Sequence, residues 1–75
     1  MENADLSGVD LSNAVLEKAV MNGINLSGAN LSDSFLNVAN LSDANLSGAT
    51  LHGAVVSGAS FSGATFCNTI TSDRE

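Results

Sequence analysis

Apolar residues recur along this chain at every fifth position. From residue 6 to residue 66, thirteen successive positions spaced by five carry Leu, Met, Val or Phe. The residue two places before each of them is Ala at ten of the thirteen positions. Ser and then Gly or Asp follow the apolar residue in many units, as in Ala29-Asn30-Leu31-Ser32-Asp33. Such regularity indicates a repeat protein built from five-residue units.

Neither a helix nor a straight strand can bury this pattern. In an α-helix five residues advance by about 500°, which scatters the apolar side chains around the axis. In a strand, alternate units would place them on opposite faces. A chain that turns a corner in every unit keeps them inside, because Gly and Asp accept turn dihedrals at little cost. Four corners close a square, so the sequence predicts an all-β solenoid with about 20 residues per coil.

The units Ile24-Asn25-Leu26-Ser27-Gly28 and Ala39-Asn40-Leu41-Ser42-Asp43 resemble the pentapeptide-repeat family, whose usual formula is A(D/N)LXX. The resemblance extends from residue 4 to about residue 68 and implies a right-handed quadrilateral β-helix. Short chains of this kind are similar to many cyanobacterial members, and Thr65-Phe66-Cys67-Asn68-Thr69 looks like the end of such sequences. We therefore expect a little over three coils, with a β-helix over residues 1–68 and a short C-terminal tail over residues 69–75.

Charge and composition narrow the classes of partner. Eight acidic residues stand against Lys18 and Arg74 alone, which gives a net charge of −6. This balance disfavours direct binding to nucleic acid or to an anionic membrane. No segment has the length of a transmembrane helix, and the N-terminus lacks the pattern of a signal peptide, so we expect a cytoplasmic protein.

No constellation of residues in the sequence indicates catalysis or metal binding. His52, the only His, falls in an outward column with Ser12 and Ser32, where a nucleophile–base pair would lack a third member. Cys67 is the only Cys, which excludes an internal disulfide framework. The carboxylates are spread over different faces without metal-ligand spacing. We expect no enzymatic activity, no metal and no cofactor.

Residues 20 apart should stack, and one of the four resulting outward columns is apolar. Its members are Val15, Phe35 and Val55, with Val38 beside them at the neighbouring corner. The other three columns are mainly polar. Two interpretations stay open. β-Branched and aromatic residues suit an extended segment and are tolerated outside, or the four residues form a contact patch for another subunit or partner.

These observations favour a non-catalytic structural or protein-interaction module. A homodimer is plausible through the apolar column or by end-to-end stacking, where Phe61 and Phe66 of the last coil would meet the partner. Docking onto another solenoid is a third arrangement. The family resemblance adds an alternative function, because some longer members imitate duplex DNA and protect or inhibit DNA gyrase. The negative charge fits that role, but a stub about 15 Å tall would cover only about four or five base pairs.

Overall fold

Residues 20 apart lie side by side throughout residues 2–71, the part of the chain that the computed structural model describes. Within those residues, parallel bridges form four columns that start at Asp5, Asp10, Val15 and Val20 and step upward by 20 residues. Each bridge joins one residue of a coil to the residue 20 positions later, in the next coil. No helix and no longer strand is assigned in residues 2–71, because a corner follows two residues after every bridge.

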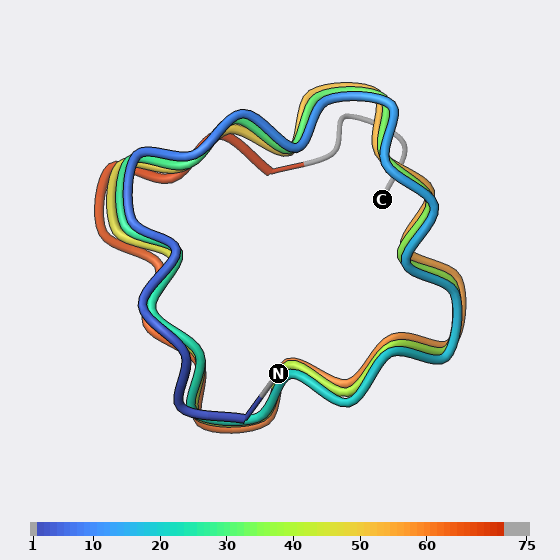
Figure 1. The fold of residues 1–75 in the computed structure, drawn as a ribbon, viewed down its shortest axis with the longest axis horizontal. Helices are drawn as coiled ribbons and strands as arrows, with labels where there is room; N and C mark the ends of the chain where they lie inside the picture. The colour runs from blue at the N-terminus through green and yellow to red at the C-terminus, as the bar shows by residue number, and fades with distance from the viewer. Residues whose placement is uncertain (1, 72–75) are drawn as a thin grey trace.

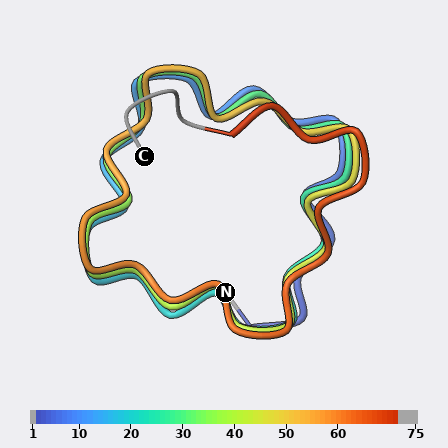
Figure 2. The same ribbon diagram turned by 180° about the vertical axis from the view of Figure 1, so that it is seen from behind.

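The backbone outlines four sides around a common centre (Figure 1). From the blue N-terminal coil in front, the chain runs clockwise as it recedes, so the coil is right-handed. The reverse view shows the same superposed coils with the C-terminal one in front (Figure 2). The body measures 25 × 22 × 19 Å, and its shortest dimension follows the axis of the coil.

Each corner is a turn with one left-handed residue. Every fifth residue from 3 to 68 has a positive φ; seven of these are Gly, and the others are Asn3, Asn13, Lys18, Asp33, Val38, Asp43 and Asn68. The N–H of the next residue closes the turn, as Ala29 does by donating to the Leu26 carbonyl at 3.0 Å. A positive φ at the third residue of a four-residue turn is the type II pattern, which Gly and Asn adopt at low cost.

The polar residue before each central Leu prepares the corner. Asn25 Oδ1 accepts the backbone N–H of Ser27 at 3.1 Å and its hydroxyl at 2.9 Å. Five further outward residues accept the N–H two positions later in the same way: Asp5, Asp10, Asn30, Asn40 and Asn45. Because short polar side chains readily bond to nearby backbone, Asp or Asn before the centre and Ser after it stabilise the turn locally.

The core lies in the middle coils. All of the fully buried hydrophobic residues fall between Met21 and Ala54. Ser34 replaces Ala at one small inward position, and its hydroxyl donates to the Leu31 carbonyl at 2.8 Å, so the buried oxygen is satisfied. Inward residues of the first and last coils, such as Leu6 and Phe61, are half-buried because a neighbouring coil covers them on one side only.

The ladder of coils continues beyond residue 68. Ile70 pairs with Thr50, and the Thr69 hydroxyl donates to the Leu46 carbonyl at 2.5 Å. The expected division between a repeat over residues 1–68 and a tail over 69–75 stays a prediction, since residues 72–75 lie outside the described part of the chain, as does Met1. Within residues 2–71 there is no apolar helix of the length that crossing a membrane requires.

Candidate functional site

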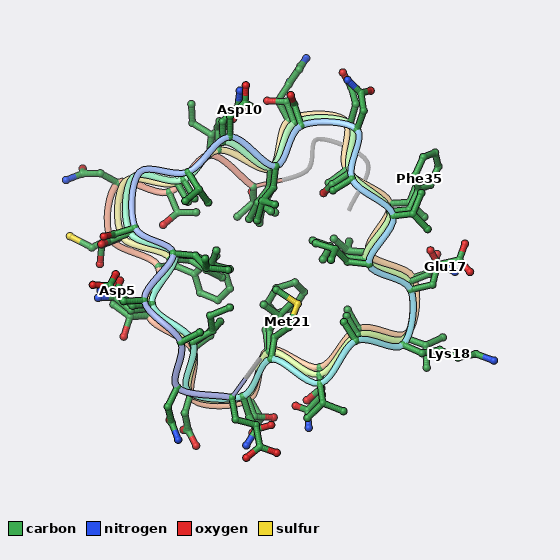
Figure 3. All side chains as sticks on the ribbon, viewed as in Figure 1. Asp5, Asp10, Glu17, Lys18, Met21 and Phe35 are labelled. Carbon is green, nitrogen blue, oxygen red and sulfur yellow. The ribbon has the colours of Figure 1, made fainter. Side chains whose placement is uncertain are left out.

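Three apolar side chains are stacked on the outer surface of one side of the coil. Val15 pairs with Phe35, and Phe35 pairs with Val55, in parallel bridges. Their exposed fractions are 71%, 42% and 39%. Figure 3 shows that Phe35 points away from the interior. With Val38, which is 55% exposed at the adjoining corner, these residues are called the stripe below. The structure therefore places three of the four predicted contact residues in one outward column, with Val38 at the adjoining corner.

Val38 occupies a turn position that valine rarely adopts. Its φ is 64°, in the left-handed region, where an L-residue with a branched Cβ is under strain of about 1–2 kcal/mol. The residue above it in the corner column is Gly58, and a Cβ on that glycine would lie 3.4 Å from Val38 Cγ2. An apolar side chain is thus kept on the surface where Gly or Asn would fit with less strain.

The stripe side lacks the polar bond that prepares the corners elsewhere. On the two adjoining sides, Asn30 and Asn40 accept the backbone N–H of the second residue after them at 3.0 and 3.1 Å. A valine or phenylalanine side chain has no acceptor for such a bond, whose net stabilisation is about 0.5–1.5 kcal/mol. All three coils omit this bond on the stripe side, which favours a use for the apolar surface.

Charged residues border the stripe at both corners. Glu17 and Lys18 point into solvent beside the side that carries Phe35 (Figure 3). Asp33 holds the turn position at the other corner, with a φ of 60° close to the 61° of Lys18. These flanking positions were not among the predicted contact residues, nor was Val20, an outward residue that is 50% exposed on the adjoining side. The regular spacing of the turn positions could have identified Lys18 and Asp33. Val20 lies at an outward bridge position, which the spacing of 20 residues identifies.

The carboxylates of the first coil are bonded to neighbouring serines. Asp5 Oδ1 accepts the Ser7 hydroxyl at 2.8 Å and its N–H at 3.2 Å, and Asp10 Oδ1 accepts those of Ser12 at 2.6 and 3.0 Å. These bonds, chiefly those from the hydroxyls, lower the pKa of both carboxyl groups from the ordinary value. The two aspartates lie on different sides of the coil (Figure 3). Their local role is therefore to hold the turns.

The residues that the sequence offered for chemistry lie apart. His52 is exposed, and its backbone N–H donates to Thr50 Oγ1 at 3.3 Å. The Cys67 thiol is exposed at a different corner and accepts a bond from the Asn68 side-chain amide at 3.8 Å. Among residues 2–71 no group of three or more His, Cys, Asp or Glu side chains could hold a metal ion. The described residues thus provide no assembled catalytic arrangement.

The two phenylalanines of the last coil contact each other. The ring centroids of Phe61 and Phe66 are 5.6 Å apart, and the ring planes are inclined by 56°. Phe61 packs against the core, whereas Phe66 is 44% exposed. Both stand at inward central positions, and no further coil of residues 2–71 covers them. This geometry is compatible with end-to-end stacking, which stays a prediction.

Comparison with known proteins accounts for the repeat. The family described as pentapeptide repeats matches the chain in eight copies, over residues 1–33 and 39–70. The unmatched residues 34–38 form the unit that contains Ser34, Phe35 and Val38. No curated protein matches the sequence at a significant level. The family match therefore stops at the unit that lies in the middle of the stripe.

Solved structures give the same family. One is alr5209, a pentapeptide repeat protein from Nostoc PCC 7120; it is 34% identical over 95% of this chain and 69% of its own, with a TM-score of 0.63. Another is HetL, a pentapeptide repeat protein involved in heterocyst differentiation regulation, from the cyanobacterium Nostoc sp. strain PCC 7120. It is 33% identical over 85% of this chain and 28% of its own, with a TM-score of 0.56. The chain belongs to the pentapeptide repeat family, and these relatives imply a right-handed β-helix.

Proposed function

We propose that this protein is a non-catalytic interaction module and that the stripe is its contact surface. The observation that carries the proposal is the meeting of three irregularities on one side of the coil. The outward residue is apolar in every coil, Val38 occupies a left-handed turn position, and the family match is interrupted at residues 34–38. A four-sided solenoid with about 20 residues per coil and a little over three coils presents such a side as a flat surface.

The energetics support an interface rather than an idle surface. The outward positions of the middle coil on the other three sides are Asn25, Asn30 and Asn40, which bond to their own turns. Phe35 replaces that arrangement with an aromatic ring that is 42% exposed in the single chain. Covering apolar surface yields about 25 cal/mol per Å², and a contiguous apolar strip is characteristic of interaction sites.

Site-specific cross-linking in cells that make the protein tests this function. A photoreactive phenylalanine analogue replaces Phe35 in one variant and Asn45, on the opposite side, in a matched control. We expect a cross-linked adduct with a polypeptide from position 35 and little or none from position 45. Equal yields from the two positions, or no adduct from position 35, would contradict the proposal. The mass of the adduct reports whether the partner is a second copy or a different protein.

The alternative function is binding to a DNA gyrase by imitation of duplex DNA. The net charge of −6 is the observation in its favour. The acidic groups of the middle coils are limited to the corner residues Asp33 and Asp43, and the body is 19 Å long along the coil axis, which matches roughly five base pairs. A supercoiling assay with purified gyrase separates DNA mimicry from binding through the stripe. A DNA mimic would inhibit or protect the enzyme, and Phe35→Asp would leave that effect intact.

A further inference from the structure

Asn22 and Gly23 are the only Asn-Gly pair of the sequence, and they form the turn at one corner of the coil. We propose that this corner is a site of covalent modification, at which Asn22 loses its side-chain amide and becomes aspartate or isoaspartate. The corner borders the side that carries Asn25, which is opposite the stripe, so this inference does not depend on the proposed function.

The conversion needs only water as a co-reactant. The backbone nitrogen of Gly23 attacks the side-chain carbonyl carbon of Asn22, and the new C–N bond closes a five-membered imide. The amide nitrogen leaves as ammonia and takes the proton of the Gly23 N–H. Water then cleaves one of the two imide C–N bonds, which gives aspartate or, when the chain continues through the side chain, isoaspartate. Because glycine has no Cβ, it hinders the attack least.

A second asparagine occupies the same place in an equivalent corner. Asn37 precedes Val38, and φ is 73° at Gly23 and 64° at Val38. Gly23 donates its N–H to the Ser42 carbonyl at 2.8 Å, and Val38 donates to the Ser57 carbonyl at the same distance. Both nitrogens must therefore leave the same kind of bond before they react, through a local opening of the corner. At Asn37 the branched valine side chain then hinders the attack.

The outward asparagines are held in a different way. The side-chain oxygens of Asn25, Asn30, Asn40 and Asn45 each accept the backbone N–H of the residue two positions later. These bonds fix the side-chain carbonyl, and leucine rather than glycine follows each of the four residues. The position at a corner and the glycine after it therefore single out Asn22.

Isoaspartate at position 22 would disturb the contact between successive coils. In the unmodified chain, Asn3 donates its N–H to the Asn22 carbonyl at 3.1 Å. In isoaspartate that carbonyl belongs to a free carboxylate, and the main chain of the unit gains one methylene group. The corner then no longer fits the five-residue spacing. The bonds that Asn3 and Gly23 donate are expected to weaken together.

Storage of the folded protein in a mildly alkaline buffer tests the site. Each conversion replaces a neutral amide with a carboxylate and changes the net charge by one, from −6 to −7, so ion-exchange chromatography separates the products. Fragmentation mass spectrometry locates the modified residue and distinguishes aspartate from isoaspartate. The same chain unfolded in urea sets the time scale of the reaction. We expect conversion at Asn22 and little or none at Asn37.

Two variants reverse the difference between the corners. Asn22→Ser produces the Ser-Gly pair that the chain already has at residues 27–28 and should remove the more acidic form. Val38→Gly makes a second Asn-Gly pair on a left-handed backbone that suits glycine and should add conversion at Asn37. Circular dichroism verifies that both variants are folded. Equal conversion at Asn22 and Asn37 in the wild type, or no conversion at Asn37 in Val38→Gly, would overturn the proposal. A folded wild type that stays unmodified while the unfolded chain is converted would also overturn it.

Amide hydrogen exchange measures the effect on the coils. In the isolated isoaspartate form, the N–H groups of Asn3 and Gly23 should exchange faster than in the unmodified protein. The matched corner provides the control, because Lys18 donates to the Asn37 carbonyl at 3.0 Å as Asn3 does to that of residue 22. Lys18 and Val38 should keep their protection. Unchanged exchange at both Asn3 and Gly23 would overturn the predicted effect on the coils.

Discussion

The side of the coil that carries Asn45 and the opposite side that carries Phe35 share one backbone pattern and one interior. Leu26 donates its N–H to the Asn45 carbonyl at 2.8 Å, and Leu36 donates to the Val55 carbonyl at the same distance. Both leucines are fully buried. On the outside, Asn45 accepts a bond from its own turn at 3.1 Å, whereas Phe35 exposes its ring to solvent.

This difference shows where the repeat is constrained and where it is free. The inward residues and the turn residues must suit the coil on every side, because each coil covers the next. The outward residue of each unit contacts only its neighbours in the column and the solvent. A surface for a partner can therefore be placed at outward positions without a change in the fold. In this way a repeat protein keeps the residues that form its fold apart from those that bind a partner.

The largest expected effect tests the claim that the two sides share an interior. Leu26→Ala and Leu36→Ala each remove a fully buried side chain from the same coil, one behind each side. Each should lower the free energy of unfolding by about 2–5 kcal/mol, through lost burial and the cavity left behind. Urea unfolding followed by circular dichroism measures both. A much smaller loss for Leu36→Ala would mean that the stripe side is packed differently.

A somewhat smaller loss of stability is expected from Ala in place of a corner glycine, and it should differ between the columns of Gly48 and Gly53. Gly48 and Gly53 have φ values of 71° and 74°, so Ala at either position incurs the cost of a left-handed residue, about 1–2 kcal/mol. A Cβ on Gly48 would lie 3.7 Å from Gly28 N, whereas one on Gly53, at the corner beside the stripe, would overlap Asp33 Oδ1. Gly53→Ala should therefore be the more destabilising change in thermal unfolding.

Removal of the overlapping side chain provides the control for that experiment. Asp33→Gly should rescue Gly53→Ala, because the added methyl group would then have space, and it should have no such effect on Gly48→Ala. Equal losses for the two alanine variants, or a rescue of both, would show that contact with Asp33 does not distinguish the corners.

The outward positions themselves are expected to respond with opposite signs. Asn45→Ala removes the acceptor of the Ser47 N–H and should lower the free energy of unfolding by about 1 kcal/mol. Val15→Asn introduces the same kind of acceptor on the stripe side at its most exposed member and should raise that free energy by up to about 1 kcal/mol. Differential scanning calorimetry at low concentration compares the two. A clear loss for Val15→Asn would favour the simpler interpretation, in which valine is there for its strand preference.

The smallest expected effect is on how the stability depends on pH. It arises on the side opposite the stripe, which carries Asp5, and on an adjoining side, which carries Asp10. Serine hydroxyls lower the pKa of Asp5 and Asp10 in the folded chain, so the carboxylates stabilise it fully above the unfolded pKa of about 3.9. That contribution is lost as the pH falls through the lower folded pKa. The double variant Asp5→Asn, Asp10→Asn keeps the acceptors and removes the charge. Its melting temperature should decline less than that of the wild type between about pH 5 and about pH 2; parallel curves would contradict the assignment.

The five-residue period accounts for most of what the sequence could predict. It places Leu at the centre and Ala two residues before it, and the bridges follow the expected spacing of 20 residues. The column of Val15, Phe35 and Val55 follows from that arithmetic alone. The period does not reveal that each side pairs through a single residue, because the extent of a bridge depends on how soon the backbone turns into the next corner.

Side-chain details at the corners were beyond the sequence pattern. The period places Val38 at a corner, but it does not give the φ of 64° that the residue adopts there. The fit of Asp33 beneath Gly53 depends on the side-chain conformation of the aspartate. Contacts between corner side chains of successive coils therefore need coordinates, whereas the filling of the interior does not.

The most direct test of the stripe as a contact surface is a comparison of amide spectra by NMR with and without an extract of the cells that make the protein. Spectra of the ¹⁵N-labelled protein report every side of the coil at once. The predicted result is that signals of Val15, Phe35, Val55 and the bordering corner residues shift or broaden in the extract, while those of Asn25 and Asn45 on the opposite side stay in place. Shifts concentrated at Phe61 and Phe66, or spread equally over all four sides, would contradict the account.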